Sequence, residues 1–172
     1  QKAVDLARSL YQKYPKNTWF QAEYVRALVY AEQYEKALPI IEEVKSHFER
    51  IEGHALRHIH VGESNYTAKL MVRMYHYEGI CTLWEKKQYH EALNMFRKSL
   101  RQAKLAGLEA YHYLPADYYY MGICYDYLRL RHQAEEAFKK VLDMDENELI
   151  SPHAKECIKA PCFHDYLSLG NL

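Results

Sequence analysis

Residues 118–142 read YYYMGICYDYLRLRHQAEEAFKKVL and have the pattern of two helices separated by a short polar turn. Ala134, Phe138 and Val141 follow the spacing i, i+4, i+7, so they share one face of a helix. Because Gly122 and Ala134 are small, the two helices can approach closely, and larger side chains then fill the space between them. The stretch therefore predicts a helical hairpin.

The same helical spacing occurs three more times, in the sets Ala3, Ala7, Leu10, then Ala37, Ile41, Val44, then Ala92, Phe96, Ser99. The four leading alanines are 34, 55 and 42 residues apart. Intervals of this length are typical of stacked helical hairpins, in which each apolar face is buried only by neighbouring units. We therefore expect an all-α solenoid of about three and a half antiparallel hairpins, forming one domain over residues 1–172.

Capping residues and prolines set the expected helix boundaries. Helices are predicted over residues 1–14, 18–30, 35–51, 68–86, 90–106, 116–130 and 133–142. Residues 53–66 contain two glycines and a Ser-Asn pair, so we expect an irregular excursion there. Ser151 and Pro152 begin a last helix, to about residue 160, which is expected to cap the final hairpin.

The charge balance narrows the classes of function. Lysine plus arginine and aspartate plus glutamate each number 23, so the formal net charge is zero. A neutral chain lacks the positive field of a nucleic-acid-binding protein, and no apolar run is long enough to cross a bilayer. Neither a phosphate-binding glycine loop nor a G-x-S-x-G motif is present. We therefore expect a non-catalytic protein without a cofactor.

A group of histidines gives a rival interpretation. His54, His58 and His60 lie within seven residues, and a helix would place the first two on one face. Imidazoles at i and i+4 can chelate zinc. No glutamate stands between them to act as a general base. We favour a solvated loop here, with a metal-binding protein as the alternative function.

The four cysteines form two groups with different expected roles. Cys81 and Cys124 occupy the same place in two copies of Gly-Ile-Cys, and we expect both to fill a contact between helices. Cys157 and Cys162 flank Pro161 and are close enough in sequence to pair. C-x4-C without a second cysteine pair is a poor zinc signature, and the count does not fix a redox compartment.

Residues 118–142 resemble a tetratricopeptide repeat. The matching positions are Tyr118, Met121, Gly122 and Tyr125 on the first helix, and Ala134, Phe138 and Val141 on the second. Residues 3–17 resemble the second half of another unit. The middle units depart from the pattern, since Val25 replaces the small glycine and the unit around Gly79 has one extra residue before Ala92. The resemblance implies a right-handed α-α superhelix of degenerate units with elongated helices.

Tetratricopeptide arrays generally bind a peptide or a helix of a partner protein in a concave groove made by the first helix of each unit. The corresponding positions in this chain are Trp19, Arg26, Tyr30, Arg73, His76, Trp84, Tyr119, Asp126 and Tyr127. Aromatic residues and arginine are typical of binding hot spots, so the resemblance implies a groove that favours aromatic or acidic segments. The alternative is that these rings only fill contacts between helices.

Two further expectations concern how partners bind. The carboxylate clamp of chaperone-binding tetratricopeptide domains needs Lys and Asn at set groove positions, and Ala22, Arg26 and Tyr30 do not supply them. The sequence begins inside a unit, so we expect either more chain upstream or a homodimer through the apolar face of residues 3–10.

Overall fold

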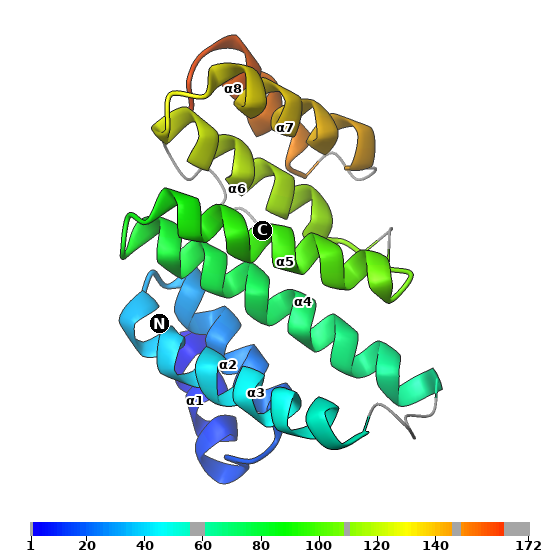
Figure 1. Ribbon diagram of the computed structural model, residues 1–172. Coiled ribbons are helices and arrows are strands. Elements are labelled where there is room, and N and C mark those ends of the chain that lie inside the picture. The colour runs from blue at the N-terminus through cyan, green and yellow to red at the C-terminus, as the bar shows by residue number, and fades with distance from the viewer. Residues whose placement is uncertain (1, 56–60, 109–110, 146–148, 164–172) are drawn as a thin grey trace.

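A computed structural model describes residues 2–55, 61–108, 111–145 and 149–163. These residues form eight α-helices and no strand (Figure 1). The helices are α1 (Lys2–Lys13), α2 (Thr18–Tyr30), α3 (Tyr34–Ala55), α4 (Val61–Trp84), α5 (Tyr89–Leu105), α6 (Tyr113–Tyr127), α7 (Arg131–Met144) and α8 (Ser151–Lys159). Within this described part of the chain, none of them is both long and apolar enough to span a membrane. The all-α prediction is confirmed.

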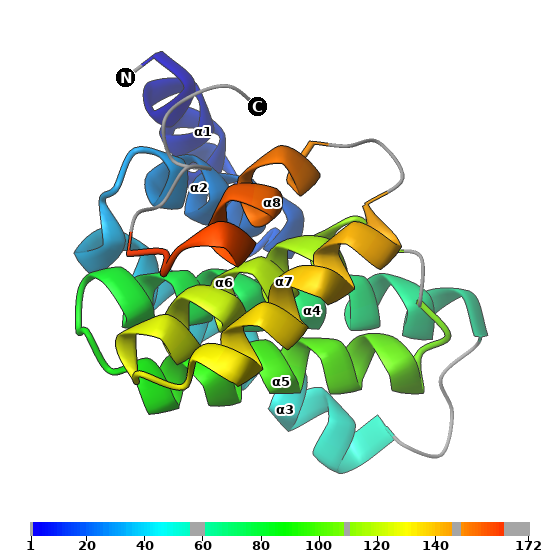
Figure 2. The same cartoon turned by 90° about the horizontal axis from the view of Figure 1, so that it is seen from above.

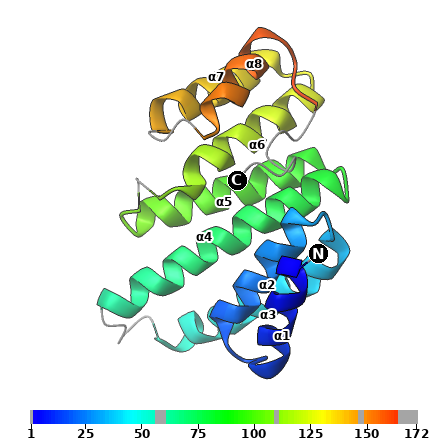
Figure 3. The same cartoon turned by 180° about the vertical axis from the view of Figure 1, so that it is seen from behind.

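Each helix packs against the next one in the sequence, from α1 through to α8. Figures 1 and 3 show this order along the molecule, with α1 at one end and α7 and α8 at the other. In addition α2 contacts α4, and α4 contacts α6, so these three helices form a row. Seen from above in Figure 2, α5, α6 and α7 lie side by side. The predicted binding residues all lie on these three helices, α2, α4 and α6.

Two hairpins use the same close contact between a glycine and a phenylalanine. A Cβ atom built on Gly79 would lie 2.5 Å from Cε1 of Phe96, and one built on Gly122 would collide with the ring of Phe138. Both phenylalanines are fully buried. Because any larger side chain at either glycine would push the ring away, these contacts explain why small residues occur there.

The first hairpin reaches the same result with different residues. Val25 stands where the other units have glycine, and Ile41 stands where they have phenylalanine; both are fully buried. A valine needs more room than a glycine, and an isoleucine fills somewhat less than a phenylalanine. The first hairpin therefore also buries an apolar pair where α2 packs on α3.

The expected excursion over residues 53–66 is wrong in most of its length. α3 continues to Ala55 and α4 already begins at Val61; residues 56–60 lie outside the described part of the chain. Glycine in a helix costs only about 1 kcal/mol relative to alanine, so Gly53 and Gly62 do not break these long helices. The helix expected from residue 68 thus begins seven residues earlier.

α6 also begins earlier than predicted. It starts at Tyr113, with Pro115 inside its first turn. The first four N–H groups of a helix have no partner within that helix, so a proline in this turn loses no hydrogen bond. The early start brings Tyr113 beside α4, which matters for the cavity described next.

Candidate partner-binding site

A cavity of about 960 Å³ lies between α2, α4 and the beginning of α6. From α2 it is lined by Trp19, Glu23 and Arg26, and from α4 by Tyr66, Lys69, Leu70 and Arg73. Tyr111, His112 and Tyr113 close its third side. We call it the aromatic cavity, because four of these residues are tryptophan or tyrosine.

Two exposed rings, Trp19 and Tyr66, stand side by side in the lining of the cavity. Asn17 caps α2 by accepting hydrogen bonds from the backbone N–H groups of Trp19 (3.0 Å) and Phe20 (3.3 Å), which fixes Trp19 in the first helical turn. Its ring stacks on Tyr66 of α4, with centroids 6.4 Å apart. The two residues are 49% and 41% exposed, so both rings are available to a ligand.

Glu23 joins two arginines in the cavity. Its Oε1 accepts from Nη2 of Arg73 at 2.6 Å, and its Oε2 accepts from Nη2 of Arg26 at 2.7 Å. The Arg73 side chain is only 7% exposed, and its guanidinium lies 5.5 Å from the centroid of the Trp19 ring. Burial would lower the pKa of Arg73, but neighbouring Tyr77, Tyr113 and Glu23 together raise it above its ordinary value. Arg73 is therefore a fixed positive charge in the cavity wall.

The remaining charged groups leave the cavity positive. Arg26 is half exposed, and Lys69 is exposed, with no carboxylate of the described residues paired to it. Burial, together with the charges of Arg73 and His76, lowers the pKa of His112, so this imidazole is neutral at pH 7. Among the described lining residues, three cations thus face one carboxylate.

A buried polar network lies behind this surface and joins three helices. Nδ1 of His76 (α4) is 2.7 Å from Oδ1 of Asp117 (α6), and Oγ of Ser99 (α5) donates to Oδ2 of Asp117 at 2.6 Å. Burial raises the pKa of Asp117, against the opposite effects of His76 and Ser99. The serine bonds the carboxylate and not the imidazole, and all three side chains are buried. The network therefore ties helices together and does not form a nucleophile activated by a base.

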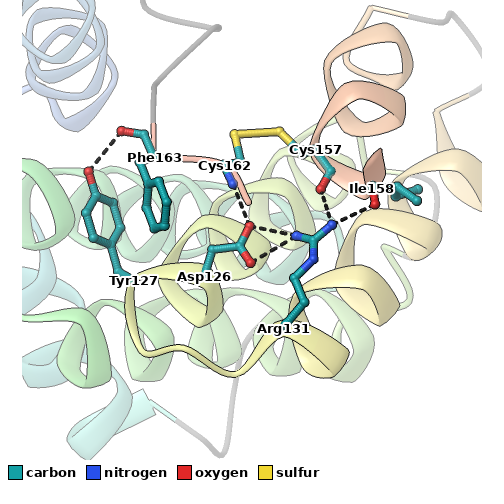
Figure 4. Close-up of a disulfide and its surroundings, with 7 residues drawn as sticks. All are labelled: Asp126, Tyr127, Arg131, Cys157, Ile158, Cys162 and Phe163. Carbon is teal, nitrogen blue, oxygen red and sulfur yellow. Dashed lines mark hydrogen bonds and ion pairs between the residues drawn. A yellow bond between two sulfur atoms is a disulfide. The ribbon is translucent and has the colours of Figure 1, made fainter. Parts of the chain in front are cut away.

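The other end of α6 is covered by the chain itself. After α8, residues 160–163 pass over it; we call them the C-terminal strap (Figure 4). Asp126 accepts two hydrogen bonds from Arg131, at 3.0 and 2.9 Å, and one from the Cys162 N–H at 2.7 Å. Nη2 of Arg131 donates to the carbonyls of Cys157 (2.6 Å) and Ile158 (2.7 Å). A Cys157–Cys162 disulfide closes the loop.

Tyr127 is held beneath the strap. Its hydroxyl donates to the carbonyl of Phe163 at 2.9 Å, and the Phe163 ring meets it edge-on at 5.1 Å (Figure 4). Its other face stacks on Tyr89 at 4.5 Å, and Trp84 packs edge-on at 6.3 Å. The side chains of Trp84 and Tyr127 therefore already have packing partners within the chain.

The predicted site residues separate into two groups. Trp19, Arg26 and Arg73 line the aromatic cavity. Tyr30 lines a neighbouring hollow of about 620 Å³ between α1 and α2, which shares Trp19, Glu23 and Arg26 with the cavity. These four predicted residues line the two hollows, Arg73 from within the wall and the other three with partly exposed side chains.

The remaining predicted residues face the protein interior or the strap. Tyr119 is fully buried and packs on Phe138, with centroids 5.9 Å apart. His76 and Asp126 are buried in the networks described above. The expectation that Tyr119, His76 and Asp126 contact a partner is therefore corrected. These positions were transferred from the family's groove without regard to the neighbouring elements that cover them.

Sequence reasoning missed more than half of the cavity. Of the ten lining residues, seven were not predicted: Glu23, Tyr66, Lys69, Leu70, Tyr111, His112 and Tyr113. Tyr66 fell inside the expected excursion, and the tyrosine-rich run 111–113 fell before the expected start of α6. The dense tyrosines between Gly107 and Pro115 were a usable signal, since such residues suit half-buried surfaces.

Two of the three histidines of the metal hypothesis, His58 and His60, lie outside the described residues, and the His54 side chain is not described. Among the residues that are described, no group of three or more His, Cys, Asp or Glu side chains is arranged to hold a metal ion. Cys81 and Cys124 are buried free thiols, and burial raises the pKa of Cys81 to about 12. Both therefore pack as small apolar residues.

Comparison of the chain with models of protein families, with curated proteins and with solved structures found no match.

Proposed function

We propose that the chain is a non-catalytic interaction module that binds a segment of a partner protein along the row of α2, α4 and α6. In this proposal the helical hairpins stack as a tetratricopeptide-like right-handed superhelix, and the row forms its inner surface. The two glycine–phenylalanine contacts, Gly79 with Phe96 and Gly122 with Phe138, support the repeat assignment. So does the contact of α4 with both α2 and α6.

The observation that carries the binding role is the pair of exposed rings, Trp19 and Tyr66, beside the buried Arg73. Tryptophan, tyrosine and arginine dominate the energetics of protein interfaces. These rings need little further ordering, since Trp19 stacks on Tyr66 and lies over the Arg73 guanidinium. A surface that is already ordered loses less conformational entropy on binding.

A polypeptide suits the site better than a compact small molecule. The aromatic cavity and the hollow between α1 and α2 share Trp19, Glu23 and Arg26, so the two adjoin across α2. A ligand extended across α2 would contact both, and an extended peptide has this shape. Its side chains can enter each hollow in turn, as in other peptide-recognition surfaces.

The proposal is tested by selecting binders from a displayed library of random peptides. The wild-type chain is compared with the double variant Trp19→Ala, Tyr66→Ala, and the selected peptides are then synthesised for affinity measurement. Removal of two hot-spot rings should cost about 2 kcal/mol or more, which is about thirtyfold in affinity.

Leu105→Ala is the matched control, because Leu105 is a large exposed apolar side chain on α5, away from both hollows. Circular dichroism must show unchanged helicity in both variants. If the double variant and the wild type select and bind the same peptides equally well, the cavity is not the binding surface and the proposal fails.

A further inference from the structure

The aromatic cavity has an uncompensated positive charge. Both carboxylate oxygens of Glu23 are already occupied, by Arg26 and by Arg73. No carboxylate of the described residues, Glu23 included, forms an ion pair with the Lys69 ammonium. The charge on Lys69 is left for a group that is not part of the described chain.

The two reachable cations sit beside apolar walls. Lys69 is exposed and Arg26 is half exposed. Arg73 is almost completely buried, and its charge adds to the positive electrostatic potential of the cavity. Trp19 and Tyr66 present exposed ring surface next to these charges. An ion pair formed against such walls is less screened by water than one on an open helix face.

The combination selects for one kind of ligand. A purely apolar segment would leave Lys69 without a partner and would partly desolvate it. A purely acidic segment would leave the aromatic surface exposed to water. Only a segment that carries a carboxylate next to an apolar or aromatic side chain matches both features of the wall.

We propose that the partner segment places an internal Asp or Glu side chain against Lys69, while a neighbouring apolar or aromatic side chain lies on Trp19 and Tyr66. This inference rests on the proposed function and specifies its ligand. The carboxylate is assigned to a side chain, which the amide analogue of that side chain tests below. The hollow that adjoins the cavity at Trp19 and Arg26 gives the rest of the segment a path toward α1.

Charge reversal at Lys69 is the sharpest test. The peptide library is selected on the wild type, on Lys69→Glu and on the control Lys139→Glu, which reverses an exposed lysine on α7. Wild type and control should enrich Asp and Glu beside apolar residues. Lys69→Glu should lose this preference and enrich Lys or Arg at the same position.

A peptide selected on the wild type is then synthesised with its acidic residue and with the amide analogue, and both are titrated by fluorescence anisotropy. The amide should bind the wild type and Lys139→Glu about tenfold more weakly, equivalent to about 1.4 kcal/mol. It should bind Lys69→Glu no more weakly than the acidic peptide does. The wild-type difference should shrink in high salt, since exposed ion pairs are screened.

The outcomes separate the two proposals. Peptides that depend on Trp19 and Tyr66 but show no acidic preference leave the proposed function standing and overturn the acidic inference, as does a preference for basic residues. If no peptide depends on the two rings, the proposed function itself fails. If sedimentation shows a dimer that the ring variant dissociates, a second copy of the chain occupies the cavity, and the acidic-segment inference is overturned.

Discussion

The surface around α2 and the C-terminal end of α6 carry aromatic residues in different surroundings, since the first is open and the second is covered. Tyr30, Trp84 and Tyr127 are spaced by 54 and 43 residues, as Val25, Gly79 and Gly122 are, so each aromatic occupies the same place in its unit. Tyr30 is 48% exposed beside the cavity, whereas Tyr127 lies beneath the strap. The matching spacing places an aromatic ring at the end of each of the helices α2, α4 and α6, and the neighbouring elements decide whether that ring is exposed.

The two regions also differ in how they treat a carboxylate. Glu23 is partly exposed and balances two arginines at a surface. Asp126 is buried and receives three hydrogen bonds from Arg131 and Cys162. A buried carboxylate with full hydrogen bonding holds its surroundings in one arrangement, while a partly exposed one leaves its partners able to accept a ligand.

The largest expected effect comes from the buried network that joins α4, α5 and α6. Asp117→Ala should lower the free energy of unfolding by about 3–5 kcal/mol, because it leaves His76 and Ser99 buried without their shared acceptor. Urea unfolding followed by circular dichroism measures it. Ser99→Ala, which removes one donor only, should cost about 1 kcal/mol. Equal losses in the two variants would show that Asp117 does not hold the three helices together.

Next in size is the closed end of α6. Asp126→Ala should cost about 2–3 kcal/mol, because Arg131 and the Cys162 N–H lose their acceptor. Hydrogen exchange should show faster exchange of the Cys162 amide while affinity for peptides at the aromatic cavity stays the same. A changed peptide affinity would mean that the two regions are coupled and that the contrast between them is incomplete.

The disulfide should contribute somewhat less. Cys157→Ser removes a crosslink that closes a loop of six residues, and chain entropy gives about 2 kcal/mol for a loop of that length. The measurement is thermal unfolding of the variant and the wild type, each with and without reductant. Reductant should destabilise only the wild type. If it lowers the melting temperature of both proteins equally, the Cys157–Cys162 bond is not the cause.

The smallest expected effect is a pH dependence at the open cavity. Burial and nearby positive charge lower the folded-state pKa of His112, so its contribution to stability is present above pH 6.5 and is lost as the pH falls through the lowered pKa. The imidazolium formed there adds a cation, which should strengthen binding of an acidic peptide by about threefold or less. Titrations at pH 7 and pH 5.5 measure it. His112→Gln should remove the difference, and a persisting difference would assign the titration to another group.

The sequence predicts the hairpins well because their packing depends on local spacing. Ala134 and Phe138 lie on one helical face whatever surrounds them. The small residue Gly122 indicates that another helix packs closely against it. The early start of α6 was missed because the predicted helix began only after Pro115, although the first turn of a helix tolerates proline.

The site was harder to predict than the fold, since it depends on which elements cover each position. Trp19 and Tyr127 look alike in a list of groove positions, yet only the first is open. Tyr66 lies in the part of α4 that was expected to form an irregular excursion because of Gly53 and Gly62, whereas Lys69 lies in the predicted helix but was not among the predicted groove positions. No spacing rule predicts that residues 160–163 return to α6, because that contact is long-range and made largely by backbone atoms.

The attachment of the strap has an evolutionary consequence. Asp126, Tyr127 and Arg131 bind main-chain groups of the strap and of the end of α8. These are the carbonyls of residues 157, 158 and 163 and the N–H of residue 162, which any residue except proline supplies. The anchoring side chains thus recognise the main-chain conformation of this segment and not the identity of its side chains. We therefore expect residues 160 and 161, which are exposed, to vary among homologues, while Asp126, Arg131 and the Cys157–Cys162 pair are retained.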